Sequence, residues 1–309
     1  MEFRLIQERT LDLQPQTQWT WWSAKLNSFV TCDEKKAFAL PVDGPGEAVL
    51  LNSAGPSGAA NLPVPAEVYD EFVAQPWHGF RFLGREDYAK HAEGDLLRTL
   101  VFSPDYGLLV AHPASGAILS LRSGSIELMA RDSAGFKTLD KAKTRGRHVL
   151  AFAAHPTDPA IAYGDNAGAF HLHRFDDAKF GKATKTADKQ RKASRLEFSP
   201  DGRMLMVGGM GYLATLALGP DRKFAPSHEL SASARDFIWC FERNLVFVNQ
   251  GMNGVAAYWH DLRKGFEKIG EFRLSEAVQQ LAVSSTQSHL AITLQTNSAE
   301  VQLYEIAGL

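Results

Sequence analysis

The chain has 309 residues, of which 45% are hydrophobic and 22% are charged, and its formal net charge is −2. These values are typical of a globular protein long enough to bury a large core. The nearly balanced charge excludes a general electrostatic attraction to nucleic acid or to a membrane surface, so any such attraction must be local.

The chain lacks sequence signs of secretion or membrane insertion. The longest uncharged apolar run, Val149–Ala154, is far shorter than the ~20 residues that span a bilayer. Residues 1–9 mix charged and apolar side chains, so we expect no secretory signal. Cys32 and Cys240 stand far apart without a Cys-x-x-Cys pair, which favours a reducing compartment. We therefore expect a soluble cytoplasmic protein.

The first third of the chain begins with predicted strands. Residues 3–6 alternate in polarity, and a strand centred on Trp22 is followed by strands at 29–31 and 37–40. Residues 53–65 are rich in Gly, Ala and Pro, and residues 65–73 are typical of a short helix opened by a proline. We expect residues 53–94 to form an irregular or insertion-bearing blade.

From residue 95 onward one template repeats. It consists of an apolar strand, a Ser-Pro-Asp-Gly type of turn, a second strand, a hairpin and a third strand; the clearest copy covers residues 195–218. The predicted anchors of the first strands, 41 to 50 residues apart, are Phe102, Phe152, Phe198, Trp239 and Val283. The second strands are predicted at 108–111, 161–163, 245–248 and 290–293, and the third at 117–121, 169–175, 255–259 and 301–306. The hairpins contain Gly116, Gly168, Gly254 or Asn297-Ser298, which tolerate positive φ.

A period of this length with four strands per repeat predicts an all-β, seven-bladed β-propeller over residues 1–309 as a single domain. Six blades plus an insertion is the alternative, because residues 53–94 fit the template poorly. The last repeat ends on its third strand, so we expect residues 3–6 to supply its fourth and to close the ring, which removes exposed sheet edges.

Two segments carry a family resemblance. Residues 198–218 and the run Tyr258-Trp259-His260-Asp261 resemble WD40-repeat propellers, in which the third strand ends in a Trp-Asp pair. The chain departs from that pattern because no Gly-His dipeptide opens its repeats and His260 interrupts Trp-Asp. The resemblance implies a docking platform, although the Ser-Pro-Asp-Gly turn also occurs in lactonase-type propellers.

The sequence contains few patterns that indicate catalysis. It has no phosphate-binding P-loop, no G-x-S-x-G and no H-E-x-x-H motif, and we interpret Ser57, in Gly55-Pro56-Ser57-Gly58, as a loop residue. His171 and His173 project from one strand face and, with Asp176 and Asp177, form the best metal candidate. Two His side chains on a third strand are more often half-exposed packing residues, so we expect no metal, no cofactor and no catalytic residue.

Charge is distributed unevenly along the chain. Residues 137–195 contain 13 Lys and Arg against 6 Asp, a local net charge of +7. The bases precede the first strands anchored at Phe152 and Phe198, where a WD40-type propeller has its upper-face loops. The predicted partner-binding residues of this basic patch are Lys141, Lys143, Arg145, Arg147, Lys182, Lys185, Lys189, Arg191 and Lys192.

Trp21, in the run Trp19-Thr20-Trp21-Trp22, is a further candidate. Alternation predicts that it lies on the strand face opposite its two neighbours, where an exposed tryptophan would anchor a partner; packing in the first blade is the other interpretation. Residues 75–82 allow the same two interpretations.

We therefore expect a non-catalytic protein-interaction scaffold, either a monomer or a subunit of a hetero-complex, whose partner has an acidic surface. Nucleic acid is a weaker candidate partner, because no aromatic residues alternate with the bases. The alternative function is a lactonase-like or other hydrolase with a metal at the channel mouth, and a third is a small-ligand sensor.

Overall fold

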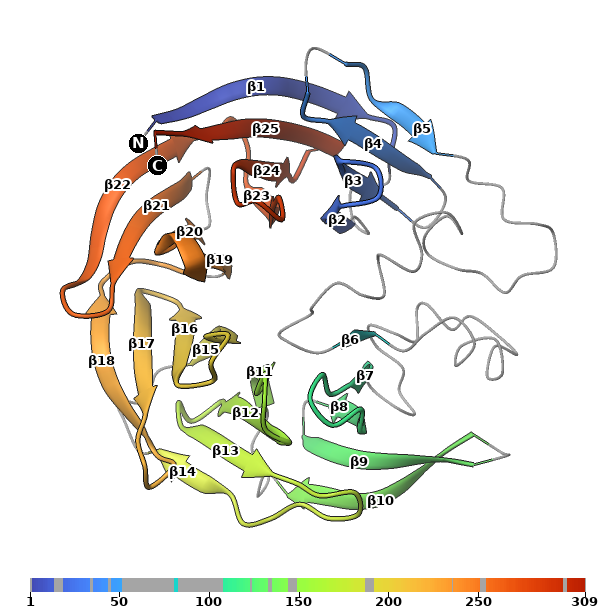
Figure 1. The fold of residues 1–309 in the computed structure, drawn as a ribbon, viewed down its shortest axis with the longest axis vertical. Coiled ribbons are helices and arrows are strands. Elements are labelled where there is room, and N and C mark those ends of the chain that lie inside the picture. Colours follow the sequence, from blue (N-terminus) through green and yellow to red (C-terminus); the bar gives the residue numbers. More distant parts are fainter. Residues whose placement is uncertain are drawn as a thin grey trace. The chain divides into compact units, whose positions relative to one another are not determined.

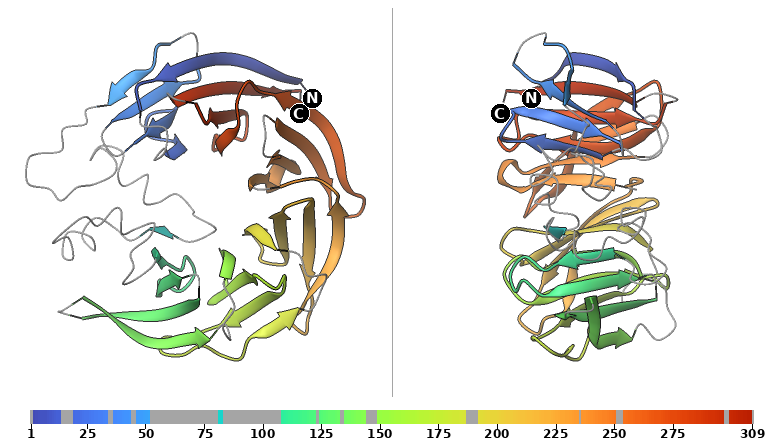
Figure 2. Two further views of the ribbon diagram at one scale, coloured as in Figure 1. Left: turned by 180° about the vertical axis from the view of Figure 1, so that it is seen from behind. Right: turned by 90° about the vertical axis from the view of Figure 1, so that its right-hand side faces the viewer.

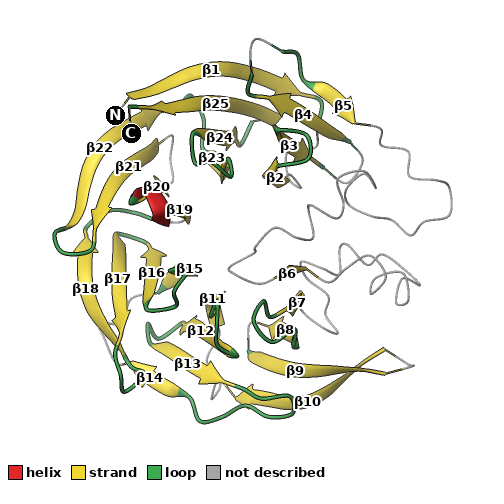
Figure 3. Ribbon diagram, viewed as in Figure 1, coloured by secondary structure: helices red, strands yellow, loops and turns green. Residues whose placement is uncertain are grey.

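The computed structural model describes residues 2–13, 19–33, 36–43, 46–51, 81–82, 108–122, 124–132, 135–143, 149–186, 192–234, 236–250, 254–296 and 299–308. All regular elements described there are β-strands apart from one 3₁₀-helix, Phe241–Arg243 (Figure 3). Within these ranges no helix has the length and apolar character needed to cross a membrane. The all-β prediction is confirmed.

The strands of the described residues form six sheets, five with four strands and one with five, and the pairings are antiparallel (Figure 1). Contacts divide the chain into two compact units. The first unit combines Met1–Phe72 with Asp236–Leu309, and the second is Val73–Arg235. Each unit contains three of the sheets.

The first unit begins and ends with the two termini of the chain. One sheet contains β2 (Trp19–Ser23), β3 (Ser28–Cys32), β4 (Ala37–Pro41) and β5 (Val49–Leu51). Another contains β19 (Asp236–Cys240), β20 (Leu245–Asn249), β21 (Gly254–Asp261) and β22 (Gly265–Arg273). The third contains β23 (Val278–Val283), β24 (His289–Leu294), β25 (Ala299–Ala307) and β1 (Glu2–Leu11).

The second unit carries the basic segment. Its first sheet has the order β10 (Gly135–Lys143), β9 (Ser125–Asp132), β8 (Ile118–Arg122), β7 (Leu108–Ala111) and β6 (Arg81–Phe82). The next contains β11 (Val149–Ala154), β12 (Ala160–Asp165), β13 (Phe170–Arg174) and β14 (Thr184–Thr186). The last contains β15 (Ala193–Phe198), β16 (Met204–Gly209), β17 (Tyr212–Leu218) and β18 (Phe224–Leu230).

The N-terminal strand completes the C-terminal sheet, as predicted. β1 runs antiparallel to β25 from Glu2 opposite Ala307 to Leu11 opposite Ala299. Figures 1 and 2 show the two strands side by side from three directions. Phe3 packs against Phe272, with ring centroids 5.0 Å apart, so β1 also contacts the neighbouring sheet of the same unit.

A buried polar network joins the β2–β5 sheet to the β23–β25 sheet. The side-chain amide of Gln280 accepts a hydrogen bond from Thr20 N (2.9 Å) and donates one to Thr20 O (3.1 Å), as a neighbouring backbone would. The Thr20 hydroxyl lies 2.8 Å from that of Thr293 and 3.1 Å from that of Thr31. Because the three threonine side chains are buried, leaving one of their hydroxyls unpaired would be costly, and the network helps to align the two sheets.

Apolar side chains fill the space between neighbouring sheets of each unit. In the second unit one cluster, with Leu196 and Leu205 fully buried, joins the β11–β14 and β15–β18 sheets. In the first unit Phe247 and Ile292 belong to a cluster that joins the sheets of β19–β22 and β23–β25. The alternation of the strands therefore serves sheet-to-sheet packing.

The repeat of the β6–β10 sheet differs from its predicted strand order. At the β7–β8 turn, His112 N donates to the carbonyl oxygen of Ala117, 2.8 Å away. The β11–β12 turn has the same bond, from His155 N to the carbonyl oxygen of Ala160 at 2.9 Å. Residues 108–111 are therefore the first strand of the repeat, not its second, and Phe102, the predicted anchor, lies outside the described residues.

The position of a β-bulge supports this correction. In three other sheets the third and fourth strands shift register in the middle of their pairing, as between Thr215 and Leu216 in β17 and between Ala257 and Tyr258 in β21. The pairing of β10 with β9 shifts register in the same way, between Thr138 and Asp140. The first and second strands shift register only at the start of the first strand, in β11, β15 and β23. β9 and β10 are therefore the third and fourth strands, and β6 is an addition beside the first.

The other predicted strands agree with the structure. The second and third strands predicted from residue 161 onward fall within β12, β13, β20, β21, β24 and β25, apart from residues at their edges. Gly116 and Gly168 have positive φ, 69° and 78°, as predicted. Gly254 does not, because it is the first residue of β21.

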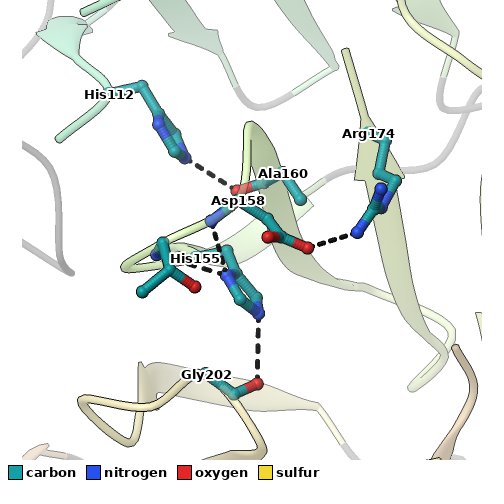
Figure 4. A network of polar contacts seen from close by, with 7 residues as sticks. His112, His155, Asp158, Ala160, Arg174 and Gly202 are labelled. Atoms are coloured by element: carbon teal, nitrogen blue, oxygen red, sulfur yellow. Dashed lines mark hydrogen bonds and ion pairs between the residues drawn. The ribbon is translucent and has the colours of Figure 1, made fainter. Parts of the chain in front are cut away.

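Two histidine rings connect consecutive turns of the second unit (Figure 4). His112 Nε2 lies 2.9 Å from the carbonyl oxygen of Ala160, and His155 Nε2 lies 3.1 Å from that of Gly202. Gly202 has φ of +71°, and a Cβ there would stand 2.2 Å from His155 Cε1. Only glycine allows this approach of ring to backbone.

The first prediction concerns β1. Phe3→Ala should lower the free energy of unfolding by ~2 kcal/mol, because it removes an aromatic contact that attaches β1 to the neighbouring sheet. Arg4→Ala, at the exposed next position of the strand, should change it by less than ~0.5 kcal/mol. Urea unfolding of both variants provides the comparison, and equal losses would show that the Phe3 contact does not hold β1.

The second prediction concerns Gly202. Gly202→Ala and Gly211→Ala both introduce a side chain at positive φ, +71° and +79°, but nothing lies within 4 Å of a Cβ at Gly211. Gly211→Ala should cost about 1–2 kcal/mol of stability from backbone strain. Gly202→Ala should cost a further 1–3 kcal/mol or so, because the His155 ring must move. Thermal or urea unfolding of the pair measures the difference, and identical losses would contradict the close packing.

Candidate functional site

The sheets of the second unit have two chemically different ends. At the connection end, the fourth strands β10 and β14 end, the next sheets begin with β11 and β15, and the β12–β13 and β16–β17 hairpins turn. At the opposite turn end lie the turns that begin at His112, His155 and Ser199. The antiparallel order assigns every connection to one of these ends.

The first group of predicted basic residues lies largely on a strand rather than in a loop. Lys141 and Lys143 belong to β10, the edge strand of its sheet; Arg145 and Arg147 are outside the described residues. Lys141 Nζ lies 2.9 Å from a carboxylate oxygen of Glu127, whose side chain is 8% exposed. Lys141 therefore pairs with a buried carboxylate while its own side chain stays 50% exposed, and its part in partner binding stays a prediction.

The second group divides between the two ends. Lys182 lies in the loop before β14, at the turn end, which corrects its predicted place. Lys185, opposite His171 in β14, and Lys192, directly before β15, lie towards the connection end, and all three lysines are exposed. Lys189 and Arg191 lie outside the described residues.

Trp21 is buried, with 4% of its surface exposed, so the expectation of an exposed anchor is wrong. Its neighbour Thr20 is also 4% exposed, and Trp22 packs edge-on against Phe29 with centroids 5.1 Å apart. Alternation does not expose one face of β2, because packing covers both. Trp21 instead fits the packing interpretation.

Met210 is the exposed apolar residue that the sequence interpretation missed. It stands at the tip of the β16–β17 hairpin and is 80% exposed, more than any other large hydrophobic residue described. The glycines on either side, Gly209 and Gly211, were the available signal, since an apolar residue between two hairpin glycines has no strand face to pack on.

The base of this hairpin is firmly held. Gly209 O accepts a hydrogen bond from Ala234 N at 2.9 Å, and the Ser194 hydroxyl lies 3.2 Å from Gly208 O. A Cβ at Gly209 would stand 2.6 Å from the carbonyl oxygen of Lys192. The exposed methionine therefore projects from an ordered backbone beside a lysine.

Lys192 is placed between two sheets. Its neighbour Ala193 packs against the backbone of Gly164 at the end of β12, where a Cβ on the glycine would lie 3.2 Å from that of Ala193. On the other side the Lys192 carbonyl faces Gly209. We call Met210, Lys185 and Lys192 the connection-end surface.

The proposed metal ligands are engaged in other contacts. His171 Nε2 pairs with a carboxylate oxygen of Asp165 at 3.0 Å, and the Tyr163 ring stacks on His171 at 4.6 Å. Burial lowers the pKa of His173 to about 4 and raises that of Tyr163 to about 12. Asp176 accepts hydrogen bonds from the backbone N–H groups of Ala178 and Lys179, which lower its pKa.

These contacts favour packing and turn formation over metal binding. Among the residues that the structure describes, no three His, Cys, Asp or Glu side chains are grouped so as to hold a metal ion. The hydrolase alternative therefore has no ligand set within that part of the chain, and it stays a prediction.

No protein-family model matches this chain, and no curated protein matches it. The resemblance to WD40 repeats thus depends on the quoted motifs and on the repeated sheets.

Proposed function

We propose that this protein is a non-catalytic interaction scaffold whose connection-end surface binds a protein partner with an acidic, partly apolar segment. The observation that carries the proposal is Met210, an 80% exposed methionine on a held hairpin whose base contacts Lys192. An unbranched apolar side chain adapts to a partner's surface, and its burial there is favourable.

The local charge supports an acidic partner. The net charge of +7 over residues 137–195 contrasts with −9 over the remainder of the chain. Lys185 and Lys192 are exposed, and neither has an ion pair with another described residue. Such cations raise the rate of encounter with an acidic surface and orient it, while the apolar contact contributes most of the affinity.

We further propose that the platform is a seven-bladed, WD40-like propeller. Turns equivalent to that of His155 begin at Ser23, His112 and Ser199. His112, His155 and Ser199 follow one another at intervals of 43 and 44 residues, whereas Ser23 and His112 are 89 residues apart. This double interval equals about the length of two repeats, which supports seven blades over six.

The third prediction tests the cations. Lys185→Glu with Lys192→Glu should reduce partner capture from a native lysate at least about tenfold, because two attractive charges become repulsive. Raising the salt concentration should weaken wild-type capture in parallel.

Lys179→Glu with Lys182→Glu is the matched control, since it makes the same charge change at the turn end of the same unit. Capture should persist in this control. Equal losses in both double variants would show that net charge, rather than the connection-end surface, controls binding.

The fourth prediction tests the apolar anchor. Met210→Ser should weaken binding of the captured partner about tenfold, which is the effect expected for losing one buried apolar side chain at an interface. The free energy of unfolding should change by less than ~0.5 kcal/mol, because Met210 is 80% exposed.

Leu262→Ser is the control, since Leu262 is 48% exposed on the β21–β22 turn, away from this surface in sequence. Calorimetry or surface plasmon resonance measures both affinities. Unchanged affinity in Met210→Ser would exclude Met210 as the anchor.

A further inference from the structure

Three turns from three sheets of the second unit form a hydrogen-bonded series through two histidine rings (Figure 4). His112, 1% exposed, reaches Ala160 O, and that oxygen also accepts the backbone N–H of His155 at 2.9 Å. His155, 5% exposed, reaches Gly202 O in the next turn. We call these two contacts the histidine links.

The hydrogen-bond partners of the two rings show which ring nitrogens carry a hydrogen. A carbonyl oxygen only accepts, so Nε2 of each histidine carries the hydrogen. His155 Nδ1 faces the backbone N–H of Asp158 at 3.1 Å and that of Thr157 at 3.4 Å, so this nitrogen accepts and carries none. The bonds of His155 are satisfied only by a neutral ring.

The surroundings of His112 oppose a positive charge. Its ring meets Phe175 edge-on at 5.1 Å, and the titratable side chain of His155 also acts against a positive charge on it. Burial, the largest influence, lowers the pKa of His112 to about 4, although the bond to Ala160 acts in the opposite direction.

His155 stands among more charges. It packs against Phe198 at 4.9 Å and is influenced by Asp158, by Asp201 of the next turn and by Arg174, whose guanidinium pairs with Asp158. Burial outweighs the two carboxylates, so the pKa of His155 is also lowered.

We propose that the histidine links make the turn end of the second unit sensitive to acid. Near neutral pH they hold three neighbouring turns together. In acid, a proton on His155 Nδ1 meets two N–H donors, and one on His112 creates a buried charge, so the links separate and the turns loosen.

The direction of the effect follows from linkage. A pKa that is lower in the folded state means that the unfolded chain binds the proton more readily, so folding loses stability as the pH falls from about 6.5 towards about 4. For His112 alone the folding equilibrium constant should be ~10-fold smaller at pH 5.5 than at pH 7.5. His155 adds to this loss.

The fifth prediction measures that loss in the full chain. Urea unfolding at pH 7.5 and 5.5, at constant ionic strength, gives the acid-induced decrease for the wild type and for the variants. His112→Gln retains a donor for Ala160 without a titrating ring. His155→Ser introduces the residue that the next sheet has at the equivalent position, Ser199, which favours folding of this variant.

Between pH 7.5 and pH 5.5 the folding equilibrium constant of the wild type decreases by a certain factor. In the double variant His112→Gln with His155→Ser this factor should be at least about tenfold smaller. His173, whose pKa is also lowered by burial, is present in both proteins, so its contribution cancels. His228→Asn, on strand β18, should retain the full wild-type decrease. A double variant with an undiminished decrease would overturn the proposal.

NMR titration of the wild-type histidine ring protons provides a second readout that needs no variant. While the protein remains folded, the ring of His112 should stay neutral at pH 5.5, and that of His155 should titrate below its ordinary pKa. A ring of either residue that becomes protonated near pH 6.5 in the folded protein would also overturn the proposal.

Discussion

Pairing of β1 with β25 is the constraint on which the first unit depends. The C-terminal sheet has only three strands from its own segment, and its edge is completed by residues 2–11. An open edge would expose a row of unpaired backbone groups, so this pairing satisfies hydrogen bonds and protects the sheet at once. Phe3 and the side-chain amide of Gln280 then join that sheet to its two neighbours in the unit, one by apolar contact and the other by imitating a backbone strand.

The two ends of the sheets in the second unit carry side chains with different roles. At the turn end, His155 bonds to the backbone of Gly202, and Asp158 pairs with Arg174. The polar side chains there therefore stabilise the turns. At the connection end, Met210 and Lys192 leave their side chains in solvent while their backbones are fixed. A rigid base under exposed side chains lowers the entropic cost of binding, which is why the latter end suits a partner and the former suits a structural role.

The alternating strands and the hairpin glycines could be predicted from the sequence, because period-two alternation and positive φ are local properties. The strand order of the β6–β10 sheet could not. Phe102-Ser103-Pro104-Asp105 has the same pattern as Phe198-Ser199-Pro200-Asp201, and only the hydrogen bonds of the turn at His112 show which strand comes first. The expected exposure of Trp21 failed for a related reason, because an aromatic ring in sequence does not reveal the second sheet that covers it. In the same way, the charge of Lys141 does not reveal the carboxylate of Glu127 that pairs with it.

By itself the sequence determined that this protein is built from repeated antiparallel strands and that its first strand pairs with its last, since both follow from residue patterns read along the chain. The tertiary structure decided which side chains remain available. Lys192 stays exposed, whereas Lys141 is engaged with Glu127. Exposure, pairing and the protonation of His112 depend on groups brought close from other strands, and the distances to those groups are fixed only when the sheets pack together.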